Sequence, residues 1–200
     1  YTNTAGTSHF IEGVNAGNSI VSRGNYNVVV GAEEGTALTQ GDESVAVGFE
    51  ALMTASTGAE NVGIGYRALK LTTGNSNVAV GKNALATNSS ASNNTAVGTS
   101  ALLANTTGHS NVALGFEALD ANTTANYNTG LGFRTLSDNT TGASNVAVGA
   151  GALKTNTTAS NNTAVGYDAL FANTTGIENV SLGSLSSDAG TIASYNVAVG

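Results

Sequence analysis

Cysteine, proline and tryptophan are absent from this chain of 200 residues, and only 10% of its residues are charged. Without cysteine there is no disulfide framework and no thiolate-bound metal. Acidic residues outnumber Lys and Arg by 13 to 6, so no basic stripe is available for nucleic-acid phosphates. No apolar run approaches the roughly 20 residues of a membrane-spanning helix. We therefore expect no nucleic-acid partner and no direct membrane insertion of this segment.

Catalytic and cofactor motifs are also missing. His9 and His109 lie far apart in sequence, with no partner at metal-ligand spacing. Gly63-Ile-Gly65 imitates a dinucleotide fingerprint but falls inside a repeat, with no helix signal after it. The acidic residues build no calcium loop, and no catalytic triad stands out. The sequence predicts a protein that is not an enzyme, with no catalytic residue, no cofactor and no metal.

What the chain has is a repeat. Eleven pentapeptides of the form Asn-Val-Ala-Val-Gly recur at a spacing of 17 residues, with one spacing of 16; they begin at Asn27, Ser44, Asn61, Asn77, Asn94, Asn111, Asn128, Asn145, Asn162, Asn179 and Asn196. A fixed period in this range is typical of a solenoid, whose coils stack on one another. The sequence predicts an all-β fold, a β-solenoid or parallel β-roll with about 17 residues per coil, over residues 27–200. Residues 1–26 match the repeat poorly and are interpreted as a degenerate N-terminal cap or junction.

Each pentapeptide alternates large and small residues, which indicates a short strand with two different faces. We expect the larger residues to face the core, together with a leucine from the opposite wall. The predicted core residues are Val78, Val80, Leu85, Val112, Leu114, Leu119, Val146, Val148 and Leu153. The small residues would then form an outward stripe suited to close contact between chains. The candidate interface residues are Ala79, Ala96, Ala113, Ala147 and Ala164.

A glycine ends every pentapeptide, where a bend with positive φ or a close backbone approach would exclude a side chain. These turn glycines include Gly48, Gly65, Gly81, Gly98, Gly115, Gly132, Gly149 and Gly166. An aromatic residue follows the glycine in about half of the copies, at a corner of the coil or between subunits. Asn-Thr-Thr segments later in the repeat have turn chemistry and are expected at a surface corner, where they bond one rung to the next.

A second pattern leaves the coil length open. From Asn77 onward, Val and Thr alternate after the first Asn of the pentapeptide, which points to a possible duplicated unit of 34 residues. A coil of 17 duplicated in pairs and a coil of 34 with two similar halves both fit. We favour 17, because one strand per coil already makes a short solenoid rung.

The repeat resembles the YadA-like head repeats of trimeric autotransporter adhesins, through Ser44-Val-Ala-Val-Gly48. It is also similar to the Asn-Thr-Ala-Val-Gly arrays of bacterial surface and phage tail-fibre proteins, through residues 162–176. The resemblance implies a left-handed parallel β-roll, three chains side by side, and an extracellular location on a cell surface or virion. The period of 17 is longer than is usual for the adhesin heads.

We therefore expect a structural segment of an extracellular fibre, acting as a rigid spacer and adhesive surface in a homotrimer. A bacteriophage tail fibre with a receptor-binding role is the alternative. A self-assembling filament and an ice-binding solenoid are further alternatives, the latter suggested by the regular Thr array. The partners left open are a host surface, an extracellular matrix and a glycan receptor.

Overall fold

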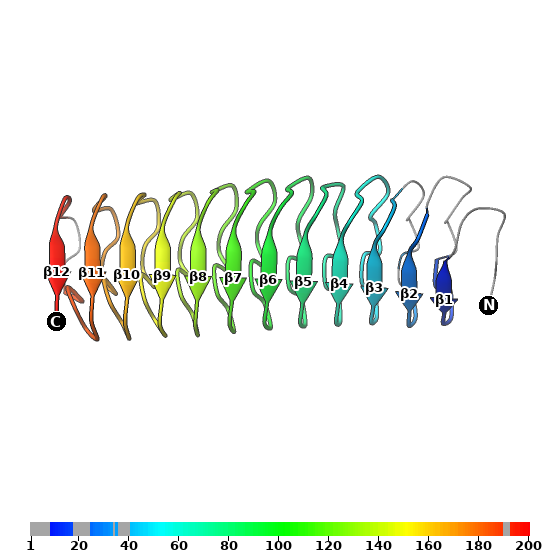
Figure 1. Cartoon of the computed structure of the whole chain (residues 1–200), viewed down its shortest axis with the longest axis horizontal. Helices are drawn as coiled ribbons and strands as arrows, with labels where there is room; N and C mark the ends of the chain where they lie inside the picture. The colour runs from blue at the N-terminus through cyan, green and yellow to red at the C-terminus, as the bar shows by residue number, and fades with distance from the viewer. Residues whose placement is uncertain (1–8, 18–24, 34, 36–40, 190–192) are drawn as a thin grey trace.

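The computed structural model describes residues 9–17, 25–33, 35, 41–189 and 193–200. It forms one sheet in which the strands follow each other in chain order along a rod (Figure 1). The strands are β1 (Phe10–Glu12), β2 (Val28–Val30), β3 (Val45–Val47), β4 (Val62–Ile64), β5 (Val78–Val80), β6 (Thr95–Val97), β7 (Val112–Leu114), β8 (Thr129–Leu131), β9 (Val146–Val148), β10 (Thr163–Val165), β11 (Val180–Leu182) and β12 (Val197–Val199). The prediction of an all-β solenoid is confirmed.

Each strand pairs in parallel with the next strand along the chain, one repeat later. Val112 pairs with Thr129, and Thr129 with Val146. Because each coil contains one strand, the coil is about 17 residues long, which is the alternative favoured from the sequence. The 34-residue pattern is therefore an alternation between neighbouring rungs, with Val and Thr stacked on each other along one column.

The sheet begins earlier in the chain than the repeat pattern indicates. Within the segment interpreted as a cap, β1 pairs in register with β2, and Gly13 takes the same positive φ as the later turn glycines. His9 occupies the position of the repeated Asn, since its Nδ1 accepts a hydrogen bond from the Asn27 amide at 3.3 Å. A twelfth, divergent copy thus runs from His9 to Gly13.

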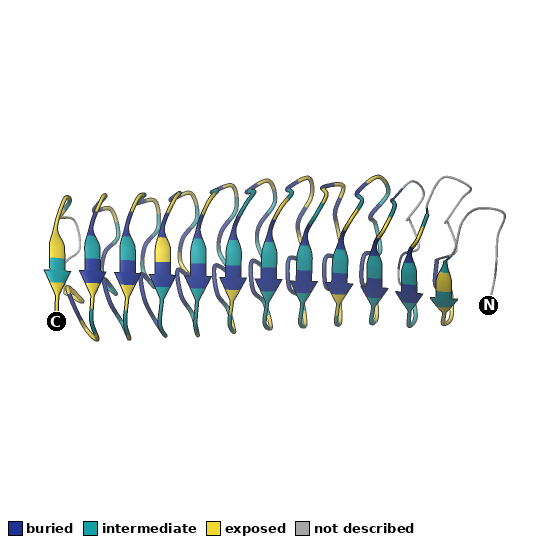
Figure 2. Ribbon diagram, viewed as in Figure 1, coloured by how far each residue is buried: buried dark blue, intermediate teal, exposed yellow. Residues whose placement is uncertain are grey.

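In β3 to β11 the small residue at the centre of the strand is buried inside the coil, which reverses the predicted faces (Figure 2). The alanines proposed as an interface are fully buried: Ala79, Ala96, Ala113, Ala147 and Ala164. The aliphatic residues on either side of them point outward and are partly or largely exposed: Val78, Val80, Val112, Leu114, Val146 and Val148. Placing these six residues in the core was wrong. Leu85, Leu119 and Leu153 are fully buried, as expected.

The physical reason is the width of the coil. Leucines from the opposite wall already fill the interior, and they approach the sheet so closely that little volume is left at the centre of each strand. At Gly63, even an added Cβ would lie 3.2 Å from Cγ of Leu52. A valine at Gly63 would overpack the core. Accordingly, β3 to β11 carry Ala, Gly or Ser at this inner position, whereas β2 carries the buried Val29.

Two columns of buried asparagines complete the interior. In the first column, Asn128 Oδ1 accepts hydrogen bonds from the backbone and the side chain of Asn145, at 2.9 and 3.2 Å. Asn128 Nδ2 donates to the Gly142 carbonyl at 2.8 Å. In the second column, Asn139 Nδ2 donates to Asn122 Oδ1 and to the Gly142 carbonyl. Buried amides are thus satisfied between rungs rather than by water, which is the condition for burying them at low cost.

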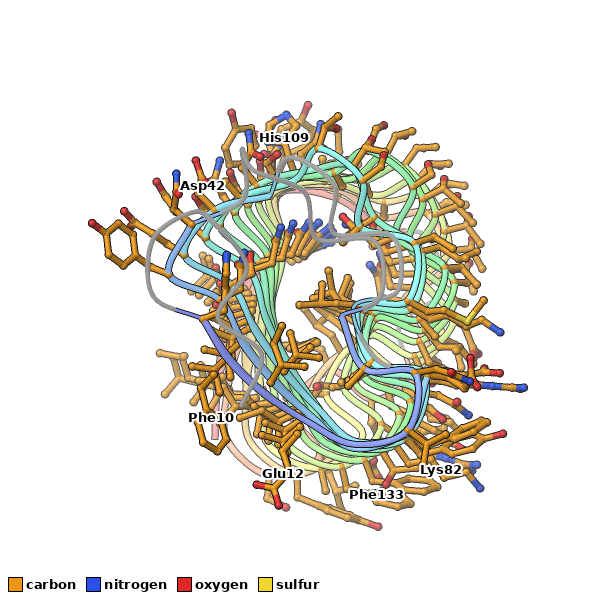
Figure 3. The ribbon with its side chains drawn as sticks, turned by 90° about the vertical axis from the view of Figure 1, so that its right-hand side faces the viewer. Phe10, Glu12, Asp42, Lys82, His109 and Phe133 are labelled. Carbon is orange, nitrogen blue, oxygen red and sulfur yellow. The ribbon has the colours of Figure 1, made fainter. Side chains whose placement is uncertain are left out.

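The chain winds as a left-handed coil. Seen from the N-terminal end, the path runs from Phe10 down to Glu12, past the corner of Lys82 and Phe133, and back over His109 and Asp42, while the coils recede (Figure 3). Crossovers between parallel strands are normally right-handed. This left-handed coil contains non-glycine residues with positive φ, in the left-handed region of backbone conformation. In one coil, Ser110, Glu117 and Leu119 have φ between 52° and 58°. Their amides donate to carbonyls of adjacent rungs at 2.9 to 3.2 Å, and these bonds offset the strain.

The turn glycines have φ between 122° and 140° and stack on each other along the rod. At Gly115, an added Cβ would overlap the carbonyl oxygen of Gly132 on the next rung. The glycine is therefore required both by its own φ and by the close approach of the next coil.

Candidate interaction surface

The outer face of the sheet is the most extensive surface feature of the rod. Two columns of side chains cover it, one at the first and one at the third position of each strand. The first column alternates between Val and Thr from β5 to β10, and the third position holds Val, Leu or Ile from β2 to β12. Leu114 is 44% exposed and Val165 is 37% exposed. From β2 to β12 no strand residue carries a charge.

Aliphatic side chains dominate this face, together with the threonines of its first column. Its side chains are β-branched or aliphatic, so their rotamers lose little freedom on contact. The stripe runs from β2 to β12, roughly 50 Å at about 4.8 Å per rung and about 10 Å across. That corresponds to on the order of 500 Å², near the upper end for the largest apolar patch of a monomer.

A separate column of side chains lies beyond the glycine bend, at the corner of the coil where Figure 3 shows Phe133 and Lys82. Aromatic residues form part of this corner column. Phe49 and Tyr66 stack with their ring centroids 5.7 Å apart, and Phe116 and Phe133 do so at 5.5 Å. These rings are 41 to 54% exposed, and a corner of the coil is one of the two positions expected for them.

Ion pairs lie beside both aromatic stacks. Arg67 contacts Glu50 at 2.6 Å and Arg134 contacts Glu117 at 2.6 Å, each between adjacent rungs. Hydrogen bonds from Lys70 and Arg67 lower the pKa of Glu50. Each Arg also lies over a ring of its own rung, with Arg67 Cζ 5.0 Å from the centroid of Tyr66. The repeated arrangement adds a charged edge next to the aromatic column.

Among the described residues, Oδ1 of Asp120 is the one buried side-chain nitrogen or oxygen atom without a hydrogen-bond partner. Burial, together with the nearby charge of Glu117, raises the pKa of Asp120 to about 6. Its half-buried carboxyl faces no cluster of metal ligands, since no group of three His, Cys, Asp or Glu able to hold a metal occurs in the described part of the chain.

Both histidines have structural contacts. His9 continues the asparagine column, and the ring of His109 packs edge-on against Tyr127, with centroids 5.0 Å apart. The Asn-Thr-Thr segments give a mixed outcome for the predicted surface corner. Their asparagines, such as Asn122 and Asn139, are fully buried, whereas the second threonine of each is exposed. The first threonine bonds the next rung as expected, for example Thr123 Oγ1 to the Thr140 carbonyl at 3.1 Å.

Comparisons with known proteins give no family. No protein-family model, no curated protein and no solved structure matches the chain. A search of the described residues for a helix that could cross a membrane found none. The surface must therefore be interpreted from its own chemistry.

Proposed function

We propose that the chain is a structural, non-enzymatic segment of an extracellular fibre, in which copies associate side by side through the outer face of the sheet. The observation that carries the proposal is the uncharged aliphatic stripe along that face. An exposed apolar surface of this length is costly in water unless something covers it. A bacterial surface adhesin and a bacteriophage tail fibre would use such a rod in the same way.

A second copy of the chain is the partner that fits the stripe best. The third strand position is aliphatic at every rung from β2 to β12, so two rods placed side by side can meet along their length through this one column. Three chains around one axis, the arrangement that the resemblance to adhesin heads implies, would enclose all the aliphatic columns. In this assembly the interface is the Val and Leu face, while the alanines stay inside each coil.

Continuous cross-rung bonding supports the role of a rigid spacer. Every coil is tied to the next by strand pairing, by the buried asparagine columns and by backbone bonds at the corners, such as Leu119 N to the Thr135 carbonyl at 2.9 Å. Bending the rod would stretch all of these bonds on one side at once. Solenoids of this type derive stability from each interface between neighbouring coils.

An ice-binding role is less well supported. In four of the Asn-Thr-Thr segments the first hydroxyl bonds the next rung. This leaves one exposed threonine column, including Thr107, Thr141 and Thr175. The outer face of the sheet alternates Val with Thr instead of presenting a continuous threonine array.

Light scattering across a range of concentrations tests the assembly. The wild-type chain should have a mass near three times 19.7 kDa. Replacing Leu114 and Leu131 by Lys on the outer face should reduce the mass to that of one chain, because like charges on adjacent rungs repel and would be buried. The matched control, Thr107→Lys with Thr124→Lys on adjacent rungs of the exposed corner, should keep the wild-type mass. A wild-type monomer at every concentration would overturn the proposed assembly.

A further inference from the structure

One coil interrupts the run of rings between Phe116 and Tyr167, in a column that is also broken at Lys82 and Thr99. At the position directly after the turn glycine, four successive coils carry Phe116, Phe133, Ala150 and Tyr167. The same coil also lacks a side chain at the next position, where its neighbours have Arg134 and Asp168 and it has Gly151. The coil of Ala150 and Gly151 therefore leaves a gap between two coils that both carry rings.

The gap is a cavity of about 230 Å³, lined by Phe133 and Tyr167 as well as by the two small residues. Its floor is formed by Ala150 and Gly151, and the carboxylate of Asp168 lies against Gly151, where any Cβ would overlap Oδ1. Gly151 has φ of 70°, the left-handed conformation that Arg134 and Asp168 share in the coils on either side. The backbone thus continues the repeat, and only the side chains are missing.

The width of the gap matches one ring. Two rungs separate Phe133 from Tyr167, which is about 9.6 Å at about 4.8 Å per rung. A ring placed midway would lie about 4.8 Å from each wall, close to the 5.5 Å at which Phe116 and Phe133 stack. Pockets for drug-sized ligands enclose roughly 300 to 1,000 Å³, so this smaller cavity suits a single ring.

The rim of the gap is polar and carries both signs of charge. Lys154 and Asp168 line it, and Lys154 Nζ lies 5.3 Å from the ring centroid of Phe171. Arg134 also lines the rim, but its guanidinium is already paired with Glu117 at 2.6 Å. An ammonium group donates hydrogen bonds and a carboxylate accepts them. Their charges cancel, so the rim favours neither an anion nor a cation.

We propose that this slot binds one neutral pyranose ring of a glycan, held between Phe133 and Tyr167, with its hydroxyls bonded to Lys154 and Asp168. The C–H groups on the faces of a sugar ring meet the electron-rich faces of the aromatic walls. Its edge hydroxyls can both donate and accept, which the rim requires. A purely apolar ring, such as a phenylalanine from another chain, would instead remove Lys154 and Asp168 from water without replacing their hydrogen bonds. The site does not depend on assembly of the rod.

Nuclear magnetic resonance titration of the labelled 200-residue chain tests the site. The probes are the methyl glycosides of glucose, galactose, mannose and N-acetylglucosamine, with p-cresol as an aromatic probe. At least one glycoside should shift the amide signals of Ala150 and Gly151 in a saturable way. Removing one wall, Phe133→Ala or Tyr167→Ala, should weaken binding about 3- to 10-fold, the value of one aromatic contact.

The most direct variant is Ala150→Phe, which fills the slot with the chain's own ring and should abolish the shifts. Thr99→Phe adds a ring at the same repeat position outside the slot and should leave binding unchanged, and circular dichroism checks that both variants fold. The proposal is overturned if no glycoside shifts these amides, if Ala150→Phe binds as well as the wild type, or if only p-cresol binds.

Discussion

At the residue scale, the turn glycine is the position with the least freedom. Gly115→Ala places a Cβ in the carbonyl oxygen of Gly132 and forces a side chain into a φ of 140°. We expect a loss of roughly 3 kcal/mol or more in the free energy of unfolding, measured by urea denaturation. Thr99→Ala, one residue after an equivalent glycine and exposed, should change stability by less than about 0.5 kcal/mol. Equal losses in the two variants would contradict the close approach between coils.

Core volume is matched within a single coil. In the coil of β8 the small strand residue is Gly130 and the residue on the opposite wall is Thr135, whereas most coils have Ala at both positions. An added Cβ at Gly130 would lie 2.9 Å from Thr135 Oγ1. We expect Gly130→Ala to destabilise the rod by about 1 to 3 kcal/mol and the double variant with Thr135→Ala to recover most of that loss. A double-mutant cycle with additive effects would contradict the coupling.

Asp120 predicts a pH effect with a definite sign. Its pKa in the folded chain is about 6, above its ordinary value of 3.8, so the folded state holds the proton more tightly than the unfolded state. Between about pH 4 and 6 its contribution to stability therefore falls as the pH rises. Asp120→Asn should add about 1 kcal/mol at pH 8, a value reduced by solvent screening of this half-buried group, and little at pH 4. A gain that is the same at both pH values would contradict the burial penalty.

At the element scale, the asparagine column joins each strand to the next. Asn128→Ala would leave the buried amide of Asn145 without its acceptor and remove the bond to the Gly142 carbonyl. We expect a loss of about 2 to 4 kcal/mol by thermal or urea unfolding. Asn128→Ser should cost less, because Ser44 already fills this position and accepts from the Asn61 amide at 3.2 Å. If the Asn128→Ser variant were as unstable as the Asn128→Ala variant, the role of the side-chain acceptor would be contradicted.

The sequence predicts these elements well but not their orientation. The period locates β2 to β12, and the leucines of the opposite wall lie in the core. Strict alternation defines two faces of a strand without saying which one is inside. The informative signal is variation: the inner position holds mostly Ala, Gly or Ser, whereas Thr95, Thr129 and Thr163 replace Val outside. Threonines facing inward would have buried hydroxyls needing partners.

The aromatic slot lies beyond what periodicity reveals. Its residues are visible in the sequence as a coil in which Ala150 and Gly151 replace the ring and the charged residue found in the coils on either side. That gap becomes a site only because neighbouring coils are adjacent in space, so that Phe133 and Tyr167 form its two walls. In the same way, the divergent copy at His9 is recognisable once its glycine, Gly13, is aligned with Gly31 by the pairing of β1 with β2.

At the scale of the whole molecule, a narrow interior leaves the larger aliphatic residues on the outside. The coil is filled by leucine, alanine and asparagine, and the remaining Val and Leu columns form a continuous stripe. The same division would supply both properties that the proposed fibre segment needs. Bonding between rungs would make the rod stiff, and the stripe would give rods a surface through which to associate.

Cysteine protection tests this division of faces most directly, because the chain has no cysteine of its own. Ser181 fills the inner strand position of another coil, so Ala147→Cys should fit, and its thiol should resist a maleimide reagent until the rod is unfolded. Thr141→Cys, on the exposed corner, should react at once under the same native conditions. An Ala147→Cys thiol labelled as fast as the exposed control in the folded rod would contradict the account.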